Sequence, residues 1–143
     1  MTLRPPQSLR PRRADDLLQD PFREEAAAER VASLVRLNRA LASALERLES
    51  AARRFREAGR EARDEARRHW RRRHAEAGEA LWNVLIQRET CGLHRHEGYL
   101  REFGVPGSVH LLMGPAATAM DPPDPPPLAE PDPAAPDRTS HPA

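Results

Sequence analysis

Apolar residues recur at helical spacing from about residue 21 onward. A leucine or phenylalanine occurs every seven residues, and a leucine or alanine follows three positions later in each repeat: Leu34, Leu41, Leu48 and Phe55, then Leu37, Ala44, Ala51 and Ala58. Such a heptad seam predicts an amphipathic helix that packs against another helix. Asp20 and Pro21 suit a helix start, because aspartate caps the first turn and proline fits the first helical position. We therefore predict a first helix over about 21–58.

A second apolar series predicts a second helix over about 61–91. Five of its residues cover an arc of about 200° at 100° per residue: Leu81, Trp82, Val84, Leu85 and Ile86. Gly59 lies between the two series. A turn somewhere in 57–68 would let the chain fold back and bury both apolar stripes. One continuous helix is the alternative, since a glycine inside a helix costs only about 1 kcal/mol.

Glycine and proline divide the region after residue 91. Gly92 is a plausible helix C-cap, Gly104 a second stop and Pro106 a helix start. We predict short helices over about 94–103 and 106–113. The expected fold is all-α: a long, coiled-coil-like helical hairpin with one or two short C-terminal helices, within a domain covering 21–114.

Proline-rich and charged tails flank this domain. Ten of the 15 prolines follow Gly114, and such a sequence has few apolar side chains to bury and few backbone donors. We expect disordered tails over 1–20 and 115–143. The second tail is acidic, and we expect it to be partly polyproline II and to act as a solvated spacer. A proline-rich ligand is the functional alternative. No segment approaches the length of a transmembrane helix or a secretory signal, so a cytoplasmic location without membrane contact is expected.

Composition limits the possible functions. Aromatic residues make up 4% of the chain and there is one cysteine, so a sheet protein and a disulfide scaffold are excluded. The small core favours self-association. The leading hypothesis is a non-enzymatic protein–protein interaction or self-assembly module, without cofactor, that forms a homodimer or binds another helical protein. Its expected contact residues are Leu34, Leu41, Leu48, Phe55, Leu81, Trp82 and Leu85.

Arginine is concentrated in one segment. The chain has 23 arginines and no lysine, a bias that a GC-rich genome explains, yet residues 53–74 hold ten arginines against four acidic residues. Such clusters bind phosphate, and Trp70 among them could stack on a base or belong to the core. Binding to a nucleic-acid backbone is therefore the alternative function, and a solvated helix surface is the plainer explanation. The candidate phosphate contacts are Arg67, Arg68, Arg71, Arg72 and Arg73.

Polar residues near the end of the second helix offer two smaller candidates. Cys91, His94 and His96 could ligate zinc, which makes a metal-binding protein the third hypothesis, although a cysteine packed as a small apolar residue is more common. A catalytic Cys–His pair lacks an identifiable orienting carboxylate, so no enzyme is expected. Arg88 and Glu89 flank the apolar face and should be paired structurally, with a small anion held by Arg88 as the alternative.

The run LWNVLIQRETCGLHRHEGYLREFGVPGSVHLLMG, residues 81–114, resembles a small bacterial family described as a domain of unknown function. Its pattern is an apolar helix ending in Val-Gln-Arg-Glu-x-Cys-Gly-Leu, followed by Val-Pro-x-x-Val and Met-Gly. The matching residues are Gln87, Arg88, Glu89, Cys91, Gly92, Leu93, Val105, Pro106, Val109, Met113 and Gly114, while Ile86 replaces the valine. Residues 24–48 are similar to the family's first helix. The resemblance implies an all-helical fold over 24–114 and no particular activity.

Overall fold

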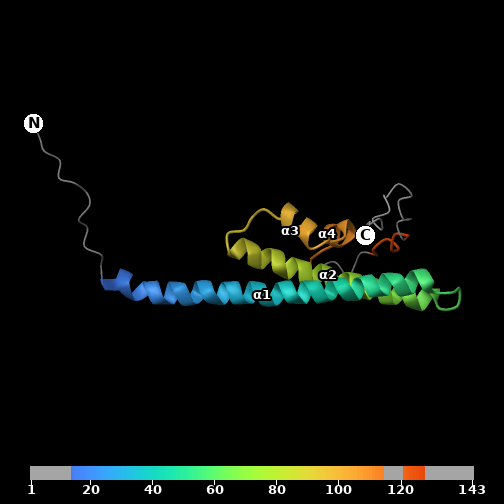
Figure 1. Ribbon diagram of the computed structural model, residues 1–143, viewed down its shortest axis with the longest axis horizontal. Coiled ribbons are helices and arrows are strands. Elements are labelled where there is room, and N and C mark those ends of the chain that lie inside the picture. The colour runs from blue at the N-terminus through green and yellow to red at the C-terminus, as the bar shows by residue number, and fades with distance from the viewer. Residues whose placement is uncertain (1–13, 115–120, 128–143) are drawn as a thin grey trace, which may run out of the picture.

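The computed structural model describes residues 14–114 and 121–127, and this part of the chain contains helices and no strand. The helices are α1 (Ala14–Glu57), α2 (Arg63–Thr90), α3 (Glu97–Glu102) and α4 (Gly107–Leu111). Figure 1 shows α1 and α2 as a long antiparallel hairpin, with α3 and α4 beside α2. The predicted all-α fold with a helical hairpin and short C-terminal helices is confirmed.

The heptad seam forms the core of the hairpin. Leu41 and Leu48 of α1 and Leu81 and Val84 of α2 are buried, each contributing about 1.5–3 kcal/mol relative to an exposed side chain. Alanines fill the alternate positions, where their small side chains let the two helices approach closely; the buried ones are Ala44, Ala51, Ala52 and Ala77. The pattern of large and small residues along the chain thus sets how α1 and α2 pack.

The turn lies inside the predicted interval. α1 ends at Glu57 and α2 begins at Arg63, and the Ala62 amide donates to the Gly59 carbonyl at 3.2 Å. Folding back here allows both apolar stripes to be buried against each other, which a continuous helix could not do within one chain.

Two glycines end helices as the sequence predicts. At the end of α2, Gly92 has φ +81°, and the Leu93 amide donates to the Arg88 carbonyl at 2.9 Å. Gly104 repeats the arrangement after α3 with φ +61°. Each glycine directly follows the C-cap residue of its helix, at a position that needs a left-handed conformation, and glycine adopts that conformation at little cost. The short helices are each a few residues shorter than predicted.

The first helix begins earlier than predicted. Residues 14–20, expected to belong to a disordered tail, form the first turns of α1, so Pro21 lies inside the helix. Proline removes one backbone hydrogen bond, but the residues before it favour helix: Leu17, Leu18 and Gln19 have good propensity, and Asp15 and Asp16 suit the positive end of the helix dipole. Residues 1–13 lie outside the described part of the chain. No described helix, α1 included, is both long and apolar enough to cross a membrane.

The prediction for the acidic C-terminal tail also needs a correction. Residues 121–127 form a defined segment near the turn end of the hairpin (Figure 1), with Pro122 and Pro125 buried. The prediction of disorder over 115–143 is therefore wrong for these seven residues, because distant side chains on α1 and α2 supply the contacts that the segment cannot make by itself. Residues 115–120 and 128–143 lie outside the description.

Candidate binding groove at the turn end of the hairpin

Arginine and aromatic side chains meet where α1 ends and α2 begins. Phe55 and Arg56 come from the last turn of α1. Arg63, Arg67 and Arg71 lie four residues apart on α2, so helical geometry places them on one face; we call these three residues the arginine ladder. The Arg63 and Arg67 guanidinium carbons lie 4.6 and 5.6 Å from the centre of the Phe55 ring. Cation–π contact thereby holds both arginines over a buried aromatic floor.

The arginine ladder binds the two aspartates of the docked segment. Arg67 donates from Nε and Nη2 to the two carboxylate oxygens of Asp124, at 3.1 and 3.0 Å. Arg71 Nη1 lies 3.2 Å from Asp121 Oδ1. The first contact is the two-pronged arrangement in which a guanidinium matches a carboxylate, so it fixes orientation as well as charge.

Two side-chain donors bind backbone carbonyls of the segment. Trp70 Nε1 donates to the Pro123 carbonyl at 3.2 Å, and Arg56 Nε donates to the Pro126 carbonyl at 3.1 Å. Proline has no amide hydrogen, so its carbonyl is the backbone group that a partner can bind. Trp70 is 4% exposed, and this hydrogen bond satisfies the indole N–H.

These contacts repeat every three residues. Asp121 and Asp124 make ion pairs, Pro122 and Pro125 are buried, and the carbonyls of Pro123 and Pro126 accept hydrogen bonds. A polyproline II helix has three residues per turn and leaves its backbone unbonded internally. We call the surface formed by Phe55, Arg56, Trp70 and the arginine ladder the groove. It contacts an acidic, an apolar and a carbonyl face of the segment, which are the faces that a polyproline II conformation would present.

The predicted phosphate contacts differ in their partners within the described chain. Arg67 and Arg71 bind the aspartates of residues 121–127, and Arg73 Nη1 lies 2.7 Å from Glu76 Oε2. Arg68 and Arg72 are exposed and make no ion pair with any described residue. Trp70 belongs to the core, so it cannot stack on a base.

The predicted interaction residues are mostly inside the molecule. Leu41, Leu48, Phe55, Leu81 and Leu85 are buried, and Leu34 packs against the core; of this set, Trp82 alone is exposed, with 36% of its surface accessible. In the described part of the chain α2 fills this seam, and contact of the seam with a second protein stays a prediction.

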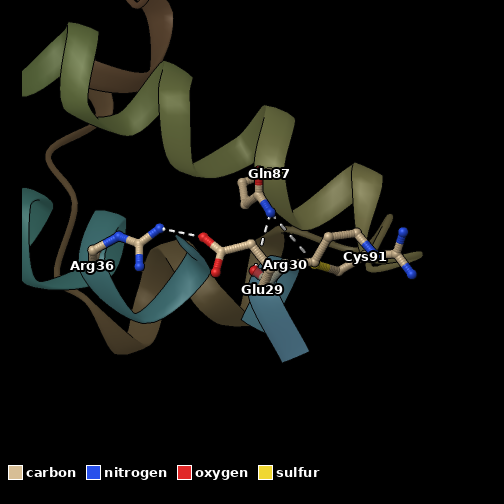
Figure 2. A network of polar contacts seen from close by, with 5 residues as sticks. All are labelled: Glu29, Arg30, Arg36, Gln87 and Cys91. Carbon is tan, nitrogen blue, oxygen red and sulfur yellow. Dashed lines mark hydrogen bonds and ion pairs between the residues drawn. The ribbon is translucent and has the colours of Figure 1, made fainter. Parts of the chain in front are cut away.

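The residues considered for zinc are not brought together. Figure 2 shows Gln87 of α2 reaching toward α1, where its Nε2 donates to the Arg30 carbonyl at 3.1 Å and Cys91 Sγ lies 4.0 Å from the same oxygen. His96 Nε2 instead lies 3.2 Å from Glu89 Oε1. Within residues 14–114 and 121–127, no three histidine, cysteine or acidic side chains are grouped to hold a metal ion. These residues tie the open end of the hairpin together.

Arg88 also makes structural contacts. Its Nη2 donates to the Arg95 carbonyl at 3.1 Å, and its guanidinium carbon lies 4.2 Å from the centre of the Tyr99 ring. Tyr99 in turn donates to Asn38 Oδ1 at 2.8 Å, and burial raises the pKa of Tyr99 to about 12. The tyrosine is therefore neutral, and the side chain links α3 to α1. These contacts match the structural pairing expected of Arg88 and Glu89.

Sequence reasoning missed Arg56, Arg63 and the docked segment as parts of one site. The available signal was the repeat Asp-Pro-Pro-Asp-Pro-Pro at 121–126, whose acidic residues recur every three positions. The basic segment 53–74 was the complementary signal. Charge alone does not show that these two segments contact each other in the folded chain.

Comparison with protein-family models, with curated proteins and with solved structures gave no match. The family resemblance of residues 81–114 stays a prediction. The geometry of the groove is the basis on which a function can be assigned.

Proposed function

We propose that the protein is a non-enzymatic interaction module whose groove binds acidic proline-rich segments of the form Asp-Pro-Pro-Asp-Pro-Pro. The observation that supports this is the repeat of contacts every three residues in segment 121–127, which occupies the groove from within the same chain. An aromatic floor with donors aimed at carbonyls is the usual way in which proteins recognise polyproline II segments, because such segments are stiff before they bind. The arginine ladder adds a requirement for acidic residues.

The contact between the groove and residues 121–127 of the same chain is suited to replacement by a partner segment. The side chains of Arg67 and Asp124 are 36% and 48% exposed, and exposed ion pairs contribute only about 0.2–1 kcal/mol each. Attachment to the same chain gives the segment an effective concentration in about the millimolar range. A partner segment with better contacts could therefore replace it.

The homodimer expected from the sequence remains part of this proposal, with a different contact surface. Since α2 fills the heptad seam, a second copy would have to use apolar side chains that the hairpin leaves exposed, such as Val31, Val35 and Ile86, or exchange its acidic segment with the first copy.

Peptide binding tests the proposal. In the full chain, Asp121→Arg with Asp124→Arg places like charges opposite Arg71 and Arg67 and should release the segment from the groove. This chain, which we call the charge-reversed chain, is titrated by calorimetry with a capped DPPDPPP peptide. Glu46→Arg with Glu79→Arg is the matched control, because both residues are exposed and their side chains make no ion pair with a described residue.

We expect the charge-reversed chain to bind DPPDPPP and the control chain, whose groove stays occupied, to bind it more weakly. A peptide of the same composition with adjacent aspartates, PPDDPPP, should bind neither chain well because it breaks the three-residue repeat. Equal affinity for the two peptides would contradict the proposal. Stronger binding of single-stranded nucleic acid than of DPPDPPP by the charge-reversed chain would favour the alternative, phosphate-binding function.

A further inference from the structure

The arginine ladder has one member more than the docked segment has aspartates. Asp121 lies against Arg71 and Asp124 against Arg67, so the segment runs in the direction opposite to α2. The next position of the three-residue repeat is residue 127, and the next arginine of the ladder is Arg63. Residue 127 is a proline, which offers no carboxylate to Arg63.

The surface around Arg63 has room for an acidic side chain. A hollow of about 420 Å³ lies beside the end of the docked segment and is lined by Phe55, Arg56, Arg63, Asp124, Pro125 and Pro127. Arg63 is held at its edge, 4.6 Å from the Phe55 ring centre, and makes no ion pair within the described ranges. The charged side chain of Arg63, the hollow and the next position of the three-residue repeat therefore lie at the same place.

We propose that the preferred ligand of the groove carries a third acidic residue in register, as in Asp-Pro-Pro-Asp-Pro-Pro-Asp, and that it displaces the chain's own segment. This inference rests on the proposed function and adds the identity of the partner: a protein with three acidic residues spaced by pairs of prolines. Pro127 makes the internal segment the weaker ligand, so the groove is occupied in the isolated chain and is open to such a partner.

The test compares three capped peptides on the charge-reversed chain: DPPDPPP, DPPDPPN and DPPDPPD. Asparagine matches aspartate in size and lacks its charge. A third ion pair of ordinary surface strength should make DPPDPPD bind more tightly than DPPDPPN, by about 1.4- to fivefold. Arg63→Gln in the charge-reversed chain should remove that difference, while Arg60→Gln, which changes an exposed arginine in the turn, should preserve it.

A second measurement uses the native tail. Pro127→Asp in the otherwise unchanged full chain should raise the midpoint of urea unfolding, Pro127→Asn should not, and Arg63→Gln should cancel the increase. This comparison needs no peptide and no charge reversal.

The outcomes separate this inference from the proposed function. If all three peptides bind equally and Pro127→Asp does not stabilise the chain, the third acidic position is refuted and the two-aspartate groove stands. A tighter DPPDPPD complex that persists in Arg63→Gln refutes the role of Arg63. If none of the peptides binds, both the proposed function and this inference are wrong.

Discussion

The ion pair between Arg67 and Asp124 holds the docked segment through two hydrogen bonds, and its removal should weaken docking measurably. Arg67 makes two hydrogen bonds, at 3.1 and 3.0 Å, with the carboxylate. Because both side chains remain partly exposed, we expect a contribution near the upper end of the range for surface pairs, about 1 kcal/mol. Arg67→Gln should lower the free energy of unfolding by about that amount, and Arg67→Lys by less, since lysine keeps the charge and loses the two-pronged geometry.

A double-mutant cycle isolates this contact. Arg67→Gln, Asp124→Asn and the combined variant are unfolded in urea, and the coupling free energy between the two sites is expected to be about 1 kcal/mol. Arg68→Gln paired with Asp124→Asn is the control, because Arg68 is exposed and makes no ion pair with a described residue. A coupling for Arg67 and Asp124 within about 0.3 kcal/mol of zero, equal to that of the control pair, would refute the docking described here.

Three further predictions concern the scaffold that holds the groove. Burial lowers the pKa of His74 below its ordinary value of 6.5, so the unfolded chain binds the proton more readily. Stability should therefore fall as the pH drops below 6.5, by at most about 1.4 kcal/mol between pH 7.5 and 5.5. His74 Nε2 lies 3.0 Å from Ser108 Oγ, and His74→Gln, which keeps a group able to bond this hydroxyl, should flatten the profile. Gly92→Ala should cost about 1 kcal/mol in thermal unfolding because residue 92 needs a positive φ. Leu41→Ala, at a fully buried position, should cost about 2–5 kcal/mol in urea unfolding, against almost nothing for Leu111→Ala.

Local patterns predicted most of the helical framework. The heptad spacing of Leu41 and Leu48 identified the buried face of α1, and Gly92 and Gly104 marked helix ends, because these features act through neighbouring residues and backbone conformation. Pro21 suggests a helix boundary, but several residues before it favour helix and α1 begins at Ala14. A proline inside a long helix removes one hydrogen bond among many.

The groove depended on information that local patterns do not carry. Hydrophobic spacing shows that Leu81 or Phe55 needs a covering surface and does not show which chain supplies it. The proline-rich segment was expected to stay solvated because it has almost nothing to bury by itself. It docks through Trp70 and the arginine ladder, whose contacts with it span 50 or more residues of sequence, and such a long-range match follows from the fold.

α1 also extends beyond the end of α2, which reaches only to the level of Arg30 (Figure 1). Residues 14–29 form a projecting section of about 24 Å at 1.5 Å per residue, and its described side chains, from 21 onward, are all exposed. Backbone hydrogen bonds there have no tertiary packing to protect them, so their amides should exchange with solvent through local fraying, while amides around Leu41 and Leu48 exchange only when the hairpin opens. One continuous helix therefore contains two dynamic regimes, with a boundary near Arg30 that hydrogen exchange can locate.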